Sequence, residues 1–225
     1  MGVEALARWN SETFGAISPV KFIEVAERIG VINQIGNFVF RRACEDILSI
    51  SPNGENTIDL SINISPKQLM EPDFSMRLVE IIDDVGIDIK RLTLEITENI
   101  LINDVNKVSP ILHRLRDLGF GISLDDFGTG YSSLSYLNNL PISEIKIDRC
   151  FIDKITESSQ SVSLIKAIIA IGRSCDMKVV AEGVESEEQH NRLVDLGCSL
   201  VQGYYFDQPL SIQKLLSRQE GKTST

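Results

Sequence analysis

Acidic, amide and lysine side chains recur in, or at the ends of, short apolar segments along this sequence. The residues concerned are Glu4, Asn63, Glu95, Asp125, Asp126, Lys146, Glu182 and Gln202. Taken singly, a charge at such a position most often faces solvent or caps the next helix. A carboxylate inside an apolar strand needs a compensating partner, because burial removes its water. Repetition of the pattern in segment after segment therefore indicates one shared polar site.

Several carboxylates at one site would repel one another strongly, and divalent cations would cancel that repulsion. The candidate ligands are all oxygen donors, which suit Mg²⁺ or Mn²⁺ and disfavour zinc. Asp125 and Asp126 are adjacent, which favours two ions about 4 Å apart with one bridging carboxylate, as in phosphodiester hydrolases. Lys146 near the ions would position or deprotonate a water. The residue types thus favour two-ion hydrolysis of a phosphodiester.

Short apolar or alternating segments predict the strands that carry these residues. Strands are expected at Val3 to Trp9, Thr57 to Asn63, Leu92 to Thr97, Gly121 to Asp125, Glu144 to Asp148, Lys178 to Glu182 and Ser199 to Gly203. Helical patterns separate nearly all of them. Helices are expected at Ser18 to Gly30, Ile32 to Ile50, Asp73 to Val85, Asp104 to Leu118, Ser161 to Cys175 and Ser186 to Leu196. Pro110 should kink or restart the fourth of these helices.

Strands that alternate with helices at this spacing pair in parallel through right-handed crossovers. The chain is therefore α/β, either a doubly wound sheet or a (β/α) barrel. The number of strands favours a barrel, in which the reacting groups lie at the carboxyl ends of the strands. A closed barrel of this kind has eight strands, whereas this sequence opens directly on a strand at Val3. We therefore expect one strand to be missing upstream.

The composition is that of a single acidic globular domain. Its 225 residues carry a net charge of −10, which disfavours binding to a nucleic-acid polymer but permits a small phosphate ligand bridged by metal ions. No apolar run reaches the ~18 residues of a membrane span, and the N-terminal residues given lack the charged-then-apolar layout of a signal peptide. We therefore expect a soluble cytoplasmic domain without membrane contact. We expect buried, reduced thiols at Cys44, Cys150, Cys175 and Cys198.

The segment from Asp125 to Ser133 is a glycine-bearing loop between a strand and a helix. It lacks the third glycine of a dinucleotide fingerprint and the Gly-Lys-Ser/Thr ending of a P-loop. We interpret it as a loop beside the site whose glycines permit positive φ angles, with Ser132 or Ser133 capping the helix that follows.

These residues occur in runs that resemble the EAL-domain cyclic-di-GMP phosphodiesterases, a family named for the tripeptide that stands here as Glu4-Ala5-Leu6. The runs are Glu4-Ala5-Leu6-Ala7-Arg8-Trp9, Asn63-Ile64-Ser65, Leu94-Glu95-Ile96-Thr97-Glu98, Asp125 to Ser133, Lys146-Ile147-Asp148-Arg149, Ala181-Glu182-Gly183-Val184-Glu185 and Gln202-Gly203-Tyr204. They follow the family's order and spacing over almost the whole chain.

The resemblance implies a modified TIM (β/α)8 barrel of EAL type whose first strand is antiparallel to the others. We expect that strand, which usually carries a Gln-Pro pair, to be missing before Met1. We place the EAL phosphodiesterase domain at residues 1–217 and a polar C-terminal tail at residues 218–225.

The resemblance also implies roles for individual residues. One ion would be held by Glu4, Asn63, Glu95 and Asp125, and the other by Asp125, Asp126 and Glu182. Lys146 would lie beside the attacking water, and the catalytic residues would be Lys146, Glu4 and Glu182. The substrate contacts would be Leu6, Arg8, Gln202 and Glu185. Glu98 would order the glycine loop.

The implied activity is metal-dependent hydrolysis of cyclic-di-GMP to linear pGpG, which lowers the level of this bacterial second messenger. Mg²⁺ or Mn²⁺ would support the reaction and Ca²⁺ would inhibit it. One alternative is a receptor that binds cyclic-di-GMP without cutting it, and another is a truncated, inactive domain. A third is a glycosidase with two carboxylates, which would leave Asn63, Lys146 and the paired aspartates unexplained. Implied partners are a second copy of the domain and an upstream sensor or GGDEF domain, in a cytoplasmic or membrane-bound protein.

Overall fold

The computed structural model describes residues 1–54, 57–129 and 137–222. The chain divides into two compact units. Unit 1 comprises Met1–Ile96 and Pro110–Gly121, and unit 2 comprises Thr97–Ser109 and Ile122–Thr225. In the described part of the chain, no helix is both long enough and apolar enough to cross a membrane.

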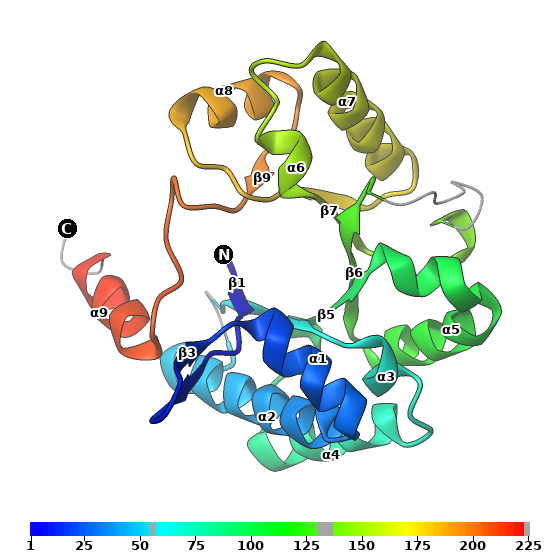
Figure 1. The fold of residues 1–225 in the computed structure, drawn as a ribbon, viewed down its shortest axis with the longest axis vertical. Coiled ribbons are helices and arrows are strands. Elements are labelled where there is room, and N and C mark those ends of the chain that lie inside the picture. Colours follow the sequence, from blue (N-terminus) through cyan, green and yellow to red (C-terminus); the bar gives the residue numbers. More distant parts are fainter. Residues whose placement is uncertain (55–56, 130–136, 223–225) are drawn as a thin grey trace. The chain divides into compact units, whose positions relative to one another are not determined.

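Unit 1 contains parallel strands in the order β1-β4-β5 (Figure 1). They are β1 (Gly2–Ala5), β4 (Asp59–Asn63) and β5 (Leu92–Thr97). Leu60 and Ile62 of β4 and Leu94 of β5 are buried, as the alternation of apolar residues predicts. The register sets Asn63 beside Glu95, so these two polar residues lie at the same level of neighbouring strands.

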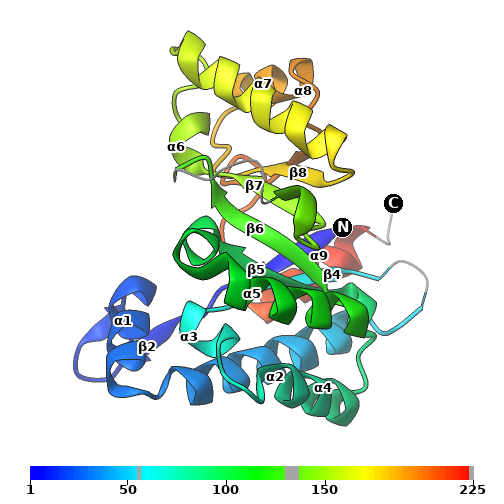
Figure 2. The same cartoon turned by 90° about the vertical axis from the view of Figure 1, so that its right-hand side faces the viewer.

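Helices pack beside this sheet and carry much of the core of unit 1. They are α1 (Pro19–Ile29), α2 (Ile32–Ile50), α3 (Pro66–Leu69), α4 (Phe74–Val85) and the 3-10 helix η1 (Ile89–Arg91). Helix α2 packs against α4, and the two lie side by side in Figure 2. Phe40 of α2 is 1% exposed, and its ring meets the ring of Phe120 edge-on with centroids 6.5 Å apart. Such aromatic pairs add to the area that burial removes from water.

Arg91 is a buried cation that ties together three segments of unit 1. It is 4% exposed. Its Nη2 and Nε donate to the backbone oxygen of Ile58 at 3.0 and 3.3 Å, and its Nη1 donates to Asn53 Oδ1 at 3.0 Å.

We predict that Arg91→Met lowers the free energy of unfolding by about 2–4 kcal/mol, because both acceptors lose their buried donor. Urea denaturation measures this. Arg77→Met, which removes a partly exposed arginine 3.8 Å from Asp73, should change stability little. Equal losses of stability in the two variants would contradict the structural role of Arg91.

The first predicted strand was wrong in its second half. Strand β1 ends at Ala5, and Trp9 begins a separate antiparallel hairpin of β2 (Trp9–Ser11) and β3 (Gly15–Ile17). Ser11 Oγ accepts hydrogen bonds from the backbone N–H groups of Thr13 and Phe14 at 3.2 Å, and Gly15 has a φ of 68°. These local bonds and the left-handed glycine make a tight turn, so the alternation of polar and apolar residues belongs to two different sheets.

Unit 2 contains parallel strands in the order β6-β7-β8-β9 (Figure 1). They are β6 (Gly121–Phe127), β7 (Glu144–Ile147), β8 (Lys178–Ala181) and β9 (Leu200–Val201). All are strands that the sequence predicts, shifted at their ends by a few residues. Parallel pairing needs crossover connections, and α7 and α8 supply them between successive strands.

The remaining elements of unit 2 are η2 (Leu137–Asn139), α6 (Arg149–Ile152), α7 (Ser159–Ser174), α8 (Glu187–Asp195) and α9 (Ile212–Lys222). Helix α7 packs against β7 and β8, and Figure 2 shows it beside these strands. Gly172 of α7 permits this approach, because a Cβ atom at this position would overlap the side chain of Val179. Helix α9 extends to Lys222, so it includes residues that we expected to lie in the polar tail.

The fourth predicted helix is longer than expected, and its break is not at Pro110. Helix α5 runs over Glu98–Leu118, and Asp104 alone inside it has non-helical angles, φ −161° and ψ 65°. Hydrogen bonds from the side chain and the backbone N–H of Lys107 lower the pKa of Asp104. Asp104 therefore acts as a cap that restarts the helix, and Pro110 is accommodated beyond that restart.

The cysteine expectation is correct for two of the four residues. Cys44 and Cys198 are 0% and 3% exposed, whereas Cys150 is exposed and Cys175 is partly exposed. All four are free thiols. Cys150 lies in the first turn of the short helix α6, where its side chain is exposed.

Candidate functional site

Three predicted metal ligands lie on the strands of unit 1. Asn63 Nδ2 donates to Glu4 Oε1 at 2.7 Å, so the ends of β1 and β4 are joined by their polar side chains. Glu95 is 2% exposed and lies beside Asn63 in the register of β4 and β5. Parallel pairing therefore sets an amide and two carboxylates on successive strands of the sheet.

The two remaining site candidates of unit 1 follow β1 directly. Leu6 is 42% exposed, and Arg8 is exposed with its Nη1 donating to the backbone oxygen of Ala7 at 3.0 Å. An exposed guanidinium carries five N–H donors, which suits a side chain that binds an external anion.

A buried lysine lies at the centre of the unit 2 candidates. The side chain of Lys146 is 3% exposed, and its Nζ lies 2.6 Å from Glu182 Oε1 and 3.9 Å from Asp125 Oδ1. The residues come from β7, the end of β8 and β6, which are neighbours in the sheet. Lys146 pairs with Val180, and Glu182 N donates to Ile147 O at 3.1 Å, so the strand register itself sets lysine and glutamate together.

A β-bulge interrupts β6 at the two successive aspartates, Asp125 and Asp126. Leu124 pairs with Ile145 and Phe127 pairs with Ile147, so β6 carries one more residue than β7 over this stretch. Asp126 has a φ of 56°, which is uncommon for a residue other than glycine. Successive side chains of a regular strand point to opposite faces, and a bulge re-aims one of them. The bulge therefore removes the alternation that would separate Asp125 from Asp126.

Asp148 is a residue of this cluster that the sequence reasoning did not assign. Burial, followed by the neighbouring charges of Asp125 and Asp148, raises the pKa of Asp126 to about 6. Asp148 also accepts a hydrogen bond from Cys150 N at 2.9 Å, as the N-cap of α6. The signal was available, since Asp148 stands two residues after Lys146 at the end of a predicted strand.

Glu98, the expected loop-ordering residue, contacts the backbone at the start of the glycine loop. It is 1% exposed, and its Oε2 accepts a hydrogen bond from Gly128 N at 2.9 Å. Gly128 has a φ of 96°, and a Cβ atom there would come within 3.0 Å of the ring of Phe151. Residues 130–133 of the predicted glycine loop, with the expected caps Ser132 and Ser133, lie outside the described residues.

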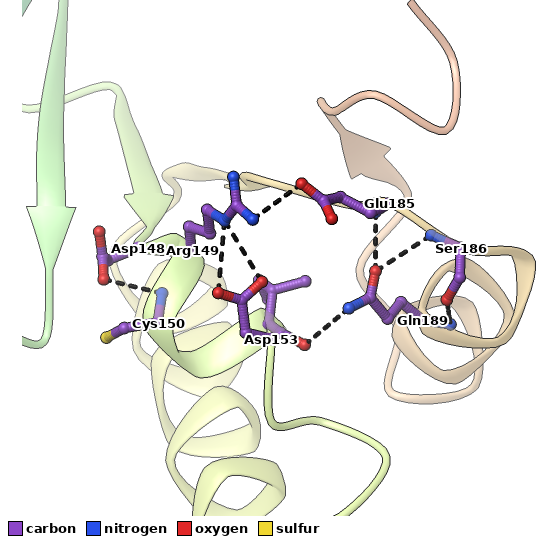
Figure 3. Close-up of polar contacts among 8 residues, drawn as sticks. Asp148, Arg149, Cys150, Asp153, Glu185, Ser186 and Gln189 are labelled. Atoms are coloured by element: carbon purple, nitrogen blue, oxygen red, sulfur yellow. Dashed lines mark hydrogen bonds and ion pairs between the residues drawn. The ribbon is translucent and has the colours of Figure 1, made fainter.

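The segment after β8, residues 182–185, runs beside the segment after β9. Val184 N donates to Gln202 O at 3.1 Å, and Tyr205 N donates to Val184 O at 2.9 Å. These bonds place the exposed Gln202 next to Val184, two residues after Glu182. Glu185, also exposed, has its Oε1 2.8 Å from Arg149 Nη2 (Figure 3).

The donor set fits hard divalent cations. In the part of the chain that the structure describes, no group of three or more His, Cys, Asp or Glu side chains stands in a ready-made metal-binding arrangement. The side chains are nevertheless oxygen donors. Burial, followed by the charges of Asp125 and Asp148, raises the pKa of Asp126 to about 6, and the charge of Lys146 offsets this only in part. A divalent cation would supply further positive charge and would favour the ionised carboxylates.

Comparison with protein families matches residues 1–209 to the family described as the EAL domain. The chain belongs to the EAL-domain family. The cyclic di-GMP phosphodiesterase NbdA of Pseudomonas aeruginosa is 40% identical to this EAL domain over 213 residues, which are 95% of the chain and 27% of NbdA. The oxygen sensor protein DosP of Escherichia coli is 38% identical over 214 residues, with coverages of 95% and 27%. This EAL domain thus spans about a quarter of the length of these relatives.

The solved structures confirm the fold class. The structure of the PaMucR phosphodiesterase in its c-di-GMP complex superposes on the EAL domain with a TM-score of 0.91, at 39% identity, over 96% of this chain and 87% of that one. The expectation of an α/β, EAL-type modified TIM barrel is therefore correct.

Gly203 of this EAL domain allows the two segments after β8 and β9 to meet. A Cβ atom on Gly203 would overlap the backbone N and O atoms of Val184, which cannot rotate away as a side chain could. We predict that Gly203→Ala lowers the free energy of unfolding by about 2 kcal/mol, measured by urea denaturation. In the control Gly2→Ala, the new Cβ would lie 3.9 Å from Asp59 O, an ordinary contact. A Gly203→Ala protein as stable as Gly2→Ala would refute the close approach.

Proposed function

We propose that this EAL domain hydrolyses one phosphodiester bond of cyclic-di-GMP and releases linear pGpG. The observation that carries the proposal is the buried Lys146, held between Glu182 and Asp125 in a chain of this family. A buried amine bonded to carboxylates is costly to fold. Such groups with specific charge partners concentrate at reaction sites.

The proposed metal ligands are the six residues that the family resemblance implies. They are Glu4, Asn63 and Glu95 in unit 1 and Asp125, Asp126 and Glu182 in unit 2. Bound there, Mg²⁺ or Mn²⁺ would lower the pKa of a water and offset the negative charge of the transition state. Ca²⁺ is larger and accepts looser geometry, so we propose that it occupies the site without supporting the reaction.

The chain's own residues then perform distinct tasks. Lys146 contributes a positive charge in a place from which water is nearly excluded, where electrostatic interactions are strong. The carboxylate of Glu182 forms an ion pair with Lys146 at 2.6 Å. We assign Glu182 the role of accepting a proton from water. Glu98 holds the backbone of Gly128 and so orders the start of the glycine loop.

Substrate contacts are proposed for side chains that face solvent beside these strands. Arg8 presents guanidinium donors suited to a phosphate, Leu6 presents an apolar surface to a base, and Gln202 presents an amide. Because the Glu185 carboxylate is bonded to Arg149, we assign Glu185 to the framework of the site.

A relative that joins two activities in one chain supports a proposal about the partners of this domain. MucR of Pseudomonas aeruginosa, 39% identical over 217 residues, is named as a bifunctional diguanylate cyclase and cyclic di-GMP phosphodiesterase. We therefore propose that the whole protein joins this domain to a sensor or GGDEF domain, and that two copies of the EAL domain associate.

The test is incubation of the purified chain with cyclic-di-GMP and Mg²⁺ or Mn²⁺, followed by chromatography of the nucleotides. We expect pGpG as the first product and no cleavage of linear dinucleotides at a comparable rate. Tight binding of cyclic-di-GMP with no pGpG in either metal would instead establish a receptor.

A further inference from the structure

The segment of residues 182–185, which we call the 182–185 loop, carries Glu182 and is held on two sides. On one side it bonds through Val184 to the segment after β9. On the other side it meets Arg149, the first residue of α6 (Figure 3). The loop therefore lies between the elements that follow β7 and β9.

Arg149 contacts both the side chain and the backbone of this loop. Its Nη2 lies 2.8 Å from Glu185 Oε1, while its Nε donates to both carboxylate oxygens of Asp153 at 3.3 Å. Its aliphatic stem lies against Gly183, where a Cβ atom would overlap Arg149 Cγ. Gly183 has a φ of 72°, so the loop turns at the point where the arginine crosses it.

A second polar bridge joins the same two elements. Gln189 Oε1 accepts hydrogen bonds from Glu185 N at 2.7 Å and from Ser186 N at 3.1 Å. Its Nε2 donates to Ile152 O at 3.3 Å, at the end of α6 (Figure 3). The end of the loop is thus tied to both ends of α6. Arg149, the first residue of α6, contacts Glu185, and Gln189 of α8 bridges the loop to Ile152, the last residue of α6.

The spacing relates this outer contact to the reaction site. Arg149 follows Lys146 by three residues, and Glu185 follows Glu182 by three. Two ion pairs therefore link the same two chain segments, the buried Lys146 to Glu182 at 2.6 Å and the exposed Arg149 to Glu185 at 2.8 Å. The outer pair and the packed Gly183 restrict the backbone on which the Glu182 side chain is carried.

We propose that Arg149 is a positioning residue, which orients Glu182 toward Lys146 by holding Glu185 and Gly183. This inference rests on the proposed phosphodiesterase function, since it assigns Arg149 a task at that site. It also means that the carboxylate of Glu185 binds Arg149 and does not bind the substrate. An exposed ion pair stabilises a fold little, so the effect of Arg149 should be seen in the rate.

The kinetic test compares Arg149→Ala, Glu185→Ala and the double variant on cyclic-di-GMP. Each single change should lower kcat about tenfold with little change in KM, because the geometry of Glu182 worsens while the substrate contacts remain. The double variant should be no slower than either single one, since both remove the same contact. A Glu185→Ala variant with raised KM and normal kcat would show that Glu185 binds substrate, and would overturn the proposal.

The control is Arg42→Ala in α2. Arg42 is also an exposed arginine that pairs with an aspartate four residues on, Asp46, at 2.9 Å. Its loss should leave both kcat and KM unchanged. A tenfold loss in Arg42→Ala as well would show that any such ion pair affects the rate, and would sink the assignment of Arg149.

Hydrogen exchange of the backbone amides gives a readout that does not depend on turnover. In Arg149→Ala the amides of residues 183–186 should exchange about tenfold faster, because local opening becomes easier, while those of α7 stay protected. Unchanged exchange in the loop would refute the positioning role even if kcat fell. Faster exchange with a wild-type kcat would refute it as well.

If the wild-type chain does not cleave cyclic-di-GMP at all, the proposed function fails, while the exchange result still decides whether Arg149 holds the loop.

Discussion

Lys146→Met should lower kcat for cyclic-di-GMP hydrolysis about 1000-fold, equivalent to about 4 kcal/mol of transition-state stabilisation. Methionine keeps the unbranched apolar stem of lysine and removes the charge. In the folded chain the Nζ of Lys146 lies 2.6 Å from Glu182 Oε1 and 3.9 Å from Asp125 Oδ1. Without it, these carboxylates repel each other, and the buried positive charge between them is lost. Chromatographic measurement of pGpG over a range of substrate concentrations separates kcat from KM.

The same substitution should also lower the free energy of unfolding by about 3 kcal/mol, because one partner of a buried ion pair is removed. Circular dichroism at the assay temperature must therefore show that the variant is folded. Lys146→Arg, which keeps the charge but changes the geometry, provides a second slow variant with a smaller stability loss. Lys107→Met removes an exposed lysine paired with Asp104 at 2.6 Å and should keep the wild-type rate. Full turnover by folded Lys146→Met would remove Lys146 from the mechanism.

Removal of divalent cations should abolish hydrolysis, with a loss of about 1000-fold or more in excess chelator. The reason is the charge of the site. Burial and the nearby Asp125 and Asp148 raise the pKa of Asp126 to about 6, and a negative substrate phosphate would increase this repulsion. Addition of Mg²⁺ or Mn²⁺ should restore pGpG formation, and Ca²⁺ should not.

Calorimetry provides the matched control for this prediction. The wild-type chain should take up Mn²⁺ in the presence of cyclic-di-GMP, and Asp125→Asn with Asp126→Asn should abolish that uptake. Glu80→Gln, at an acidic residue of α4, should leave it intact. Formation of pGpG that persists in excess chelator would refute the metal dependence, and absence of metal uptake by the wild type would contradict the two-ion proposal.

The amino-acid sequence by itself determined which residues form strands and which polar side chains they carry. Strand β5 was predicted at its observed bounds, and the polar residues Asn63, Glu95 and Asp125 were placed in strands β4, β5 and β6 from local patterns alone. Hydrophobic periodicity is a local property, because the side chains of a strand alternate between its faces. The motif runs also implied the family, and the TM-score of 0.91 against the PaMucR phosphodiesterase agrees with it.

Only the tertiary structure decided which of these side chains meet. Lys146 and Glu182 come together because β7 and β8 pair in one particular register, and Arg149 meets Glu185 for the same reason. The bulge and positive φ that turn Asp126 toward its neighbours depend on pairing between β6 and β7. The hairpin that begins at Trp9 escaped the sequence pattern, because its turn is made by bonds to Ser11. Contacts between residues far apart in the chain depend on strand pairing and loop geometry, and no local pattern encodes those.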